Sequence, residues 1–120
     1  MNIALWALQI VLAAVFLGAG LMKSTQPLVR LESKVGAWVH DVPLPLIRVT
    51  GVAEVLGAAG LILPRALHIV PGLAGFAALG LAITMVGAVV VHARRGEYNE
   101  AGINVALLVL CVVVVAAGRL

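Results

Sequence analysis

Charged residues are scarce in this chain of 120 residues: 11% are Asp, Glu, Lys or Arg, whereas 63% are hydrophobic. Soluble globular domains carry about 25% charged residues, so this composition excludes a soluble fold and predicts a membrane protein. Cys111 is the only cysteine, which excludes an internal disulfide, a CxxC redox pair and a thiolate metal cluster. Aromatic residues make up 4% and show no base-stacking pattern, so we expect no nucleic-acid partner for the net charge of +3.

Long apolar runs are abundant instead. A helix needs about 20 apolar residues to cross a bilayer, and such runs cover residues 3–22, 44–63, 70–92 and 102–118. The sequence therefore predicts an all-α fold: a single membrane domain over residues 1–120, built as a four-helix bundle that crosses the cell membrane. Nothing is left over for a soluble catalytic domain.

The connections between the spans differ in length and character. In the first, Leu28, Leu31, Val35 and Trp38 recur at helical spacing among polar residues, which predicts an amphipathic interfacial helix over residues 27–39. The second connection is tight and is bracketed by prolines 64 and 71, so we expect the second helix to end there and the third to begin, as an antiparallel hairpin.

Basic residues are more numerous in and beside the first and third connections than in the segments on the other side of the membrane. The positive-inside rule then predicts that both termini lie outside the cytoplasm. The residues concerned are Lys23, Arg30, Lys34, Arg94 and Arg95 against Arg65 and Arg119.

Several polar residues meet at one end of such a bundle. An up-down-up-down order brings Lys23, Arg48, His92 and Asn104 to the same membrane side. Glu54 lies roughly 15 Å and Thr84 roughly 12 Å below that surface, at about 1.5 Å per residue. The pattern predicts a polar funnel with Glu54 as its floor. Further candidate lining residues are Gln9 and Phe16 on the first helix and Gly51 beside Glu54.

Glu54 is the strongest candidate site residue, because an ionised side chain at bilayer depth costs a few kcal/mol and usually marks a function. Two interpretations remain open. Glu54 forms a structural ion pair with Arg48 or Lys23 that holds the bundle in register, or it is a desolvated carboxylate that exchanges protons with a ligand.

The same residues carry a family resemblance. The segments FLGAGLMK at 16–23, RVTGVAEVLGAAGLILP at 48–64 and MVGAVVVHARRGE at 85–97, with Asn104 beyond them, resemble the DoxX family of small four-helix membrane proteins. The resemblance covers essentially the whole chain. It implies a group that contains subunits of thiosulfate:quinone oxidoreductase and other oxidoreductase-associated proteins, and it marks Lys23, Arg48, Glu54, His92 and Asn104 among the family-like positions.

Three functions follow as hypotheses. The first is a quinone-linked or oxidoreductase-associated membrane subunit, in which Glu54 with Arg48 or His92 handles the proton and oxygen of a quinone headgroup. A haem on His92 is the less favoured cofactor, and no metal site is predicted. The second is an isomerase or hydrolase acting on a small lipophilic substrate, with Glu54 as acid and base and Arg48 or Lys23 stabilising an oxyanion. The third is a membrane chaperone or scaffold without catalysis.

Partners beyond the lipid bilayer are predicted from the same features: a lipophilic small molecule, an oxidoreductase and a second copy of the chain. The last rests on glycines expected on outer helix faces, Gly72, Gly75 and Gly80, which permit close helix contact in a homo-oligomer.

Overall fold

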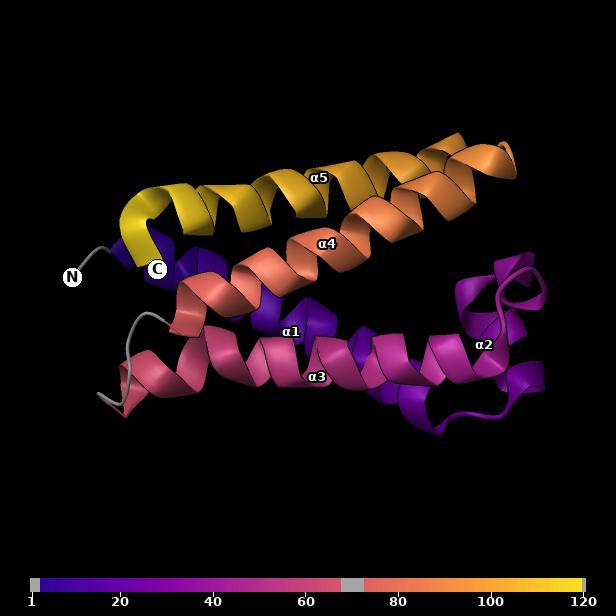
Figure 1. Ribbon diagram of the computed structural model, residues 1–120, viewed down its shortest axis with the longest axis horizontal. Coiled ribbons are helices and arrows are strands. Elements are labelled where there is room, and N and C mark those ends of the chain that lie inside the picture. The colour runs from indigo at the N-terminus through magenta and orange to yellow at the C-terminus, as the bar shows by residue number, and fades with distance from the viewer. Residues whose placement is uncertain (1–2, 68–72, 120) are drawn as a thin grey trace.

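The computed structural model describes residues 3–67 and 73–119. In chain order the elements are α1 (Ile3–Thr25), α2 (Leu28–Val35), the 3₁₀ helix η1 (Ala37–His40), α3 (Leu44–Ala66), α4 (Leu73–Arg94), α5 (Tyr98–Val114) and the short π-helix η2 (Val115–Arg119) (Figure 1). The described residues contain no strand, which confirms the predicted all-α fold.

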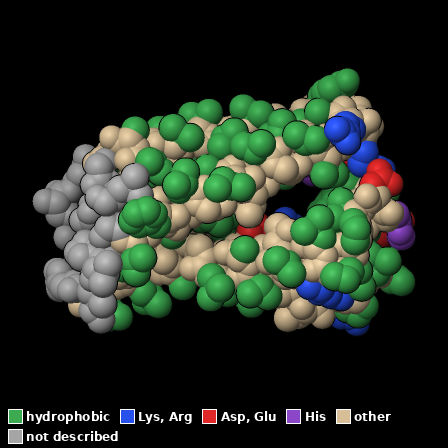
Figure 2. All heavy atoms as spheres, in the orientation of Figure 1, with side chains coloured by type: hydrophobic (Ala, Val, Ile, Leu, Met, Phe, Trp, Pro, Cys, Tyr) green, Lys and Arg blue, Asp and Glu red, His purple; other side chains and the backbone are tan. Residues whose placement is uncertain are grey.

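Four of these helices are long and apolar enough to cross a membrane, one for each predicted span. Within the described residues the candidate spans are Ile3–Thr25, Leu44–Pro64, Leu73–Arg94 and Tyr98–Ala117. Their outward side chains include Val49, Leu56, Ile83 and Ile103, all more than half exposed. Figure 2 shows hydrophobic side chains covering the flank of the bundle, as lipid contact requires.

Consecutive long helices run antiparallel (Figure 1). On α1 and α3, Gly20 lies against Gly51, whereas the earlier residue Gln9 reaches the later residue Leu61 by donating a hydrogen bond of 2.6 Å to its carbonyl oxygen. The bundle therefore has the up-down-up-down order that places the first and third connections at the same end.

Glycine allows α1 and α3 to approach closely. A Cβ added at Gly20 would lie 2.6 Å from the Gly51 carbonyl oxygen, and one added at Gly51 would lie 2.7 Å from the Ser24 amide nitrogen. Small residues at such positions let helix backbones meet in lipid, where no hydrophobic force drives the helices together. This contact determines how α1 and α3 are registered near the charged end.

The apolar core fills only one part of the bundle. All four long helices contribute to it, and toward the end that carries α2 the helices α3 and α4 diverge (Figure 1). The space between them is where the candidate site lies. The buried core residues are Leu12, Phe16, Ala58, Leu61, Ala78, Leu81, Ala82, Met85, Cys111 and Val114.

The first connection is divided where the sequence predicts one continuous helix over residues 27–39. Gly36 adopts a φ of 115°, a conformation that favours glycine, and separates α2 from η1. Leu31, Val39 and Ile47 are buried together, so this segment packs its apolar side on α3. The segment therefore covers the end of the bundle.

Pro64 does not end the second spanning helix, contrary to the prediction. It lies inside α3, which continues to Ala66, and the Leu67 amide still donates to the Leu63 carbonyl at 2.9 Å. A proline in the last turn of a helix removes only its own hydrogen bond, so the following residues can remain helical. Pro71, the other predicted boundary, lies outside the described residues.

Gly51→Ala is expected to lower the free energy of unfolding by about 1–3 kcal/mol, because the added methyl group meets the backbone of α1. The measurement is reversible unfolding in mixed detergent micelles. The matched control is Gly18→Ala on α1, where an added Cβ meets nothing within 4 Å. Equal stability of the two variants would contradict the close packing of α1 on α3.

Candidate functional site

Lys23 and Glu54 form an ion pair between α1 and α3. The Lys23 Nζ lies 2.8 Å from the Glu54 Oε1, and the two side chains are 14% and 1% exposed. Lys23 occupies the last turn of α1, where the helix dipole favours a cation. Of the two partners that the sequence leaves open for Glu54, the structure selects Lys23.

Arg48 performs a different task. Its Nη1 donates to the Lys23 carbonyl oxygen at 3.0 Å and so holds the end of α1 against α3. Arg48 precedes Glu54 by six residues, which is about 9 Å along the helix and roughly 240° around it. The two side chains therefore leave α3 on different faces.

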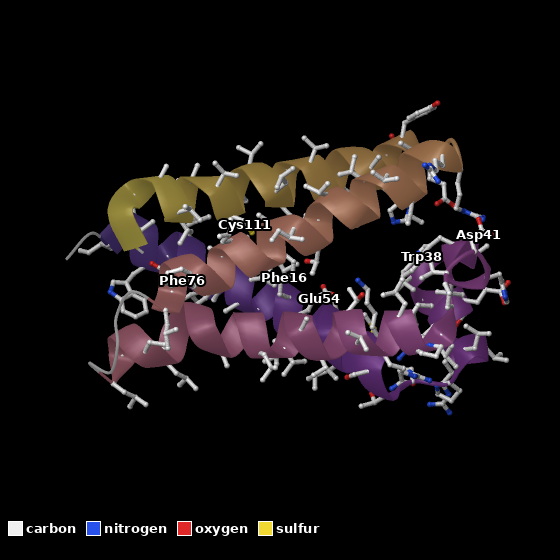
Figure 3. All side chains as sticks on the ribbon, in the orientation of Figure 1. Phe16, Trp38, Asp41, Glu54, Phe76 and Cys111 are labelled. Atoms are coloured by element: carbon white, nitrogen blue, oxygen red, sulfur yellow. The ribbon has the colours of Figure 1, made fainter. Side chains whose placement is uncertain are left out.

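A cavity of about 280 Å³ lies beside the ion pair, between α3 and α4 and under η1. Figure 2 shows it as a hollow on the flank of the bundle with charged atoms inside, and in Figure 3 Glu54 points from α3 toward α4. Lys23 belongs to the lining, so its ammonium is the charged group facing the cavity, backed by Glu54. The lining residues are Lys23, Trp38, Val42, Leu46, Ile47, Thr50, Thr84, Met85, Gly87, Ala88, Val91, His92 and Asn104.

The polar lining residues differ in whether they are already hydrogen-bonded. Thr50 donates to the Leu46 carbonyl at 2.8 Å and Thr84 to the Leu81 carbonyl at 2.7 Å, so both bond back to their own helices. The half-buried Asn104 amide makes no hydrogen bond to any described residue. An amide of this kind offers two donors and one acceptor to a ligand.

Several contacts hold η1 over the end of the cavity. The Trp38 and His92 rings meet edge to face with centroids 5.8 Å apart, and the His92 Nδ1 lies 2.8 Å from the Glu97 Oε1. Arg95 pairs with Asp41 at the end of η1, and the Arg95 Nε lies 3.3 Å from the Glu97 Oε2. We call these five residues the latch. Figure 3 shows Trp38 and Asp41 at this end of the molecule.

The hydrogen bond from His92 lowers the pKa of the Glu97 carboxyl below its ordinary value of 4.5, and Arg95 acts in the same direction. An ionised Glu97 can only accept a hydrogen bond, so the His92 Nδ1 carries the proton in this contact. The His92 Nε2 is left without a partner among the described residues.

The structure brings some of the predicted site residues together and separates others. Lys23, Thr84, His92 and Asn104 line the cavity, and Glu54 lies behind Lys23. Arg48 and Gly51 lie at the contact between α1 and α3 instead.

Gln9 and Phe16 belong to the packed part of the bundle. Gln9 is fully buried with its amide bonded to Leu61, and Phe16 is 1% exposed in the apolar core. Neither lines the cavity. Gln9 and Phe16 lie on the same face of α1 as Lys23. That face extends along the whole bundle, whereas the cavity occupies only one end.

Sequence reasoning missed Trp38 and Thr50 as lining residues. Trp38 is predicted as part of the amphipathic interfacial helix, whereas the structure places its ring centroid 5.7 Å from the Lys23 Nζ. A tryptophan two residues after a glycine in a connection between spans is the only sequence signal, and it does not specify which way the ring turns.

The arrangement is suited to binding an uncharged oxygen acceptor next to a ring. The Lys23 ammonium has two N–H groups beyond the one used by Glu54, and Asn104 adds an amide. Trp38 supplies an aromatic face, and most other lining residues are apolar. Such sites, apolar with a few oriented polar groups, are typical of small-molecule pockets.

Lys23→Met is expected to lower the free energy of unfolding by about 3–5 kcal/mol, because it leaves the Glu54 carboxylate buried without its partner. The double variant Lys23→Met/Glu54→Gln should recover most of that loss. Detergent unfolding of the wild type, of Lys23→Met, of Glu54→Gln and of the double variant measures the coupling free energy between the two side chains. Equal stability of Lys23→Met and the double variant would contradict a coupled pair.

Acid is expected to weaken the latch. Because the pKa of Glu97 is lower in the folded protein, its contribution is present above pH 4.5 and is lost as the pH falls through the folded value. Melting temperatures of the wild type and Glu97→Gln should therefore converge as the pH is lowered past 4.5. The difference between the two curves reports on Glu97. Parallel curves would contradict this assignment.

Comparison with known proteins provides one match. A protein-family model described as the DoxX-like family matches residues 7–114, most of the chain. No curated protein and no solved structure matches.

Proposed function

The chain belongs to the DoxX-like family of membrane proteins, and on this premise we propose that it binds the ring headgroup of a lipid-borne quinone in the cavity and serves a membrane oxidoreductase. The observation that carries the proposal is the Lys23 ammonium at the wall of an otherwise largely apolar cavity, with its charge balanced by the buried Glu54.

Charge balance favours an uncharged ligand. An anion drawn to Lys23 would also meet the field of Glu54, which lies 2.8 Å from the same ammonium. A carbonyl oxygen accepts a hydrogen bond from Lys23 without a net charge to desolvate, and hydrogen bonds to charged donors contribute about 1.5–3 kcal/mol. A quinone carries two such oxygens on one ring.

The size of the cavity supports a ring headgroup. An engineered apolar cavity of about 150 Å³ binds benzene, so about 280 Å³ accommodates a substituted ring. Trp38 and Met85 offer an aromatic face and a polarisable side chain against such a ring.

The chain supplies no electron carrier of its own from cysteine chemistry, since Cys111 is its only cysteine. The proposed role is therefore to hold the quinone for a partner oxidoreductase. In this role Lys23 donates to the quinone oxygen, and the Lys23–Glu54 pair supplies or receives one of the two protons that accompany transfer of two electrons by the partner. If Glu54→Gln leaves quinone-dependent electron flow in host membranes unchanged, this role is excluded.

An acid–base enzyme is the second candidate, and one observation favours it. The Lys23–Glu54 ion pair lies at the wall of a cavity large enough for a small ketone or epoxide, where Lys23 would stabilise an oxyanion. This function requires turnover without a redox partner. Absence of turnover across a panel of lipophilic ketones and epoxides would remove it.

Self-association has less support than the glycine pattern predicts. Gly75 is buried inside the molecule, which corrects its predicted place on an outer face, and Gly72 lies outside the described residues. Gly80 does line a shallow groove between α3 and α4 with Gly57 and Gly60. A homo-oligomer or scaffold role through this groove remains a proposal, to be tested by the mass of the protein in detergent.

The orientation in the membrane is also proposed. The end that carries α2 and the latch holds Lys23, Arg30, Lys34 and Arg95, so we place it on the cytoplasmic side, with both termini outside. Cysteines introduced singly at Ser33 and Asn99 should not react with a thiol reagent that stays outside the cell. If they do react, the orientation is the opposite of the one proposed.

A quinone is expected to quench Trp38 fluorescence saturably. Trp6→Phe leaves Trp38 as the only tryptophan, so the signal arises at the cavity. Asn104→Leu in this background should weaken binding about tenfold, because the lost hydrogen bond is worth about 1–1.5 kcal/mol. The measurement is a fluorescence titration with a quinone, together with mass spectrometry of quinone that copurifies.

The matched control is Asn99→Leu, the same change on an exposed position of the same helix outside the cavity, which should leave affinity unchanged. Absence of saturable quenching and of copurifying quinone in the wild type would refute quinone binding. Equal affinities of the two variants would remove Asn104 from the site.

A further inference from the structure

The cavity lies on the side of the bundle, between two spanning helices. Near the apolar core α3 and α4 touch, since a Cβ added at Gly57 would lie 2.7 Å from Leu81. Six residues farther along α4, a Cβ added at Gly87 would meet nothing within 4 Å, although Gly87 lines the cavity. The two helices have separated by then, and the gap appears as the hollow in Figure 2.

The depth of this gap places it against lipid. Thr50 follows the start of α3 by six residues, and Gly87 precedes the end of α4 by seven. At about 1.5 Å per residue, both lie roughly 9–10 Å inside the spanning segments. Leu46, also on the rim, is 53% exposed. An opening at this depth faces the acyl chains of one leaflet.

The rim of the gap is suited to an apolar passage. The Thr50 and Thr84 hydroxyls already bond to their own helices, so neither requires water there. The other exit, at the end of the bundle, is covered by η1, with Trp38 and Val42 in the cavity wall and the latch joining η1 to the loop after α4.

We infer that the ligand enters sideways from the bilayer, through a portal between α3 and α4 bounded by Leu46, Thr50, Thr84 and Gly87, and that its tail stays in lipid. This inference rests on the proposed function. It narrows the ligand class to an uncharged ring headgroup on an aliphatic tail, because the cavity holds a substituted ring and leaves no volume for a long chain.

Gly87→Leu tests the portal, since Gly87 lies on the rim and a Cβ added there meets nothing within 4 Å. In the Trp6→Phe background, two probes are titrated: a quinone with a long isoprenoid tail in lipid nanodiscs, and the same ring without a tail. Gly87→Leu should weaken binding of the tailed quinone about tenfold or more, because the tail and the leucine compete for the same gap. Binding of the ring alone should weaken by a smaller factor, because Gly87 lies at the rim of the cavity that holds the ring.

Gly18→Leu is the matched control, because Gly18 is an exposed glycine of α1 with equally open surroundings, remote from the cavity. It should leave both affinities unchanged. Unaltered binding of the tailed quinone by Gly87→Leu overturns the portal, and so does an equal loss of both probes, since the tail would then play no part. Failure of the wild type to bind either probe overturns the proposed function instead.

Discussion

One ion pair in a low-dielectric setting constrains the charged end of this molecule. Neither Lys23 nor Glu54 can face lipid without a large desolvation penalty, so α1 and α3 must bring them together. The glycines at 20 and 51 remove the side chains that would hold the helices apart, and Arg48 secures the end of α1 through the Lys23 carbonyl. This pair also makes the cavity wall polar, because Lys23 is both the partner of Glu54 and a lining residue.

The helices are packed differently at the two ends of the bundle. Where the apolar core is complete, small residues on α3 contact side chains on α4. At the charged end, closer packing of α3 and α4 would bury more polar groups. The space between these two helices is covered by η1 instead. A protein that leaves such a gap forgoes dispersion contacts there.

Much of this could be predicted from single residues. Glu54 is the only acidic residue of its span, so it must face inward, and Lys23 ends the first span on the same side as Asn104. The choice of Lys23 over Arg48 as partner was open, because it depends on how α1 is rotated against α3. The position of Trp38 was not predictable either, since the turn at Gly36 redirects the chain and an aromatic ring near a membrane interface has two favourable environments.

The four apolar helices, their antiparallel order and the end at which the charges gather can be derived from the residue order alone. These follow from the transfer free energy of each residue and from the constant rise of a helix, which are local properties. The cation that pairs with Glu54, the point at which α3 and α4 separate and the cover of the resulting cavity could be read only from the folded chain. Those outcomes depend on the rotation and tilt of each helix, which are set by the combined packing of residues far apart in the chain.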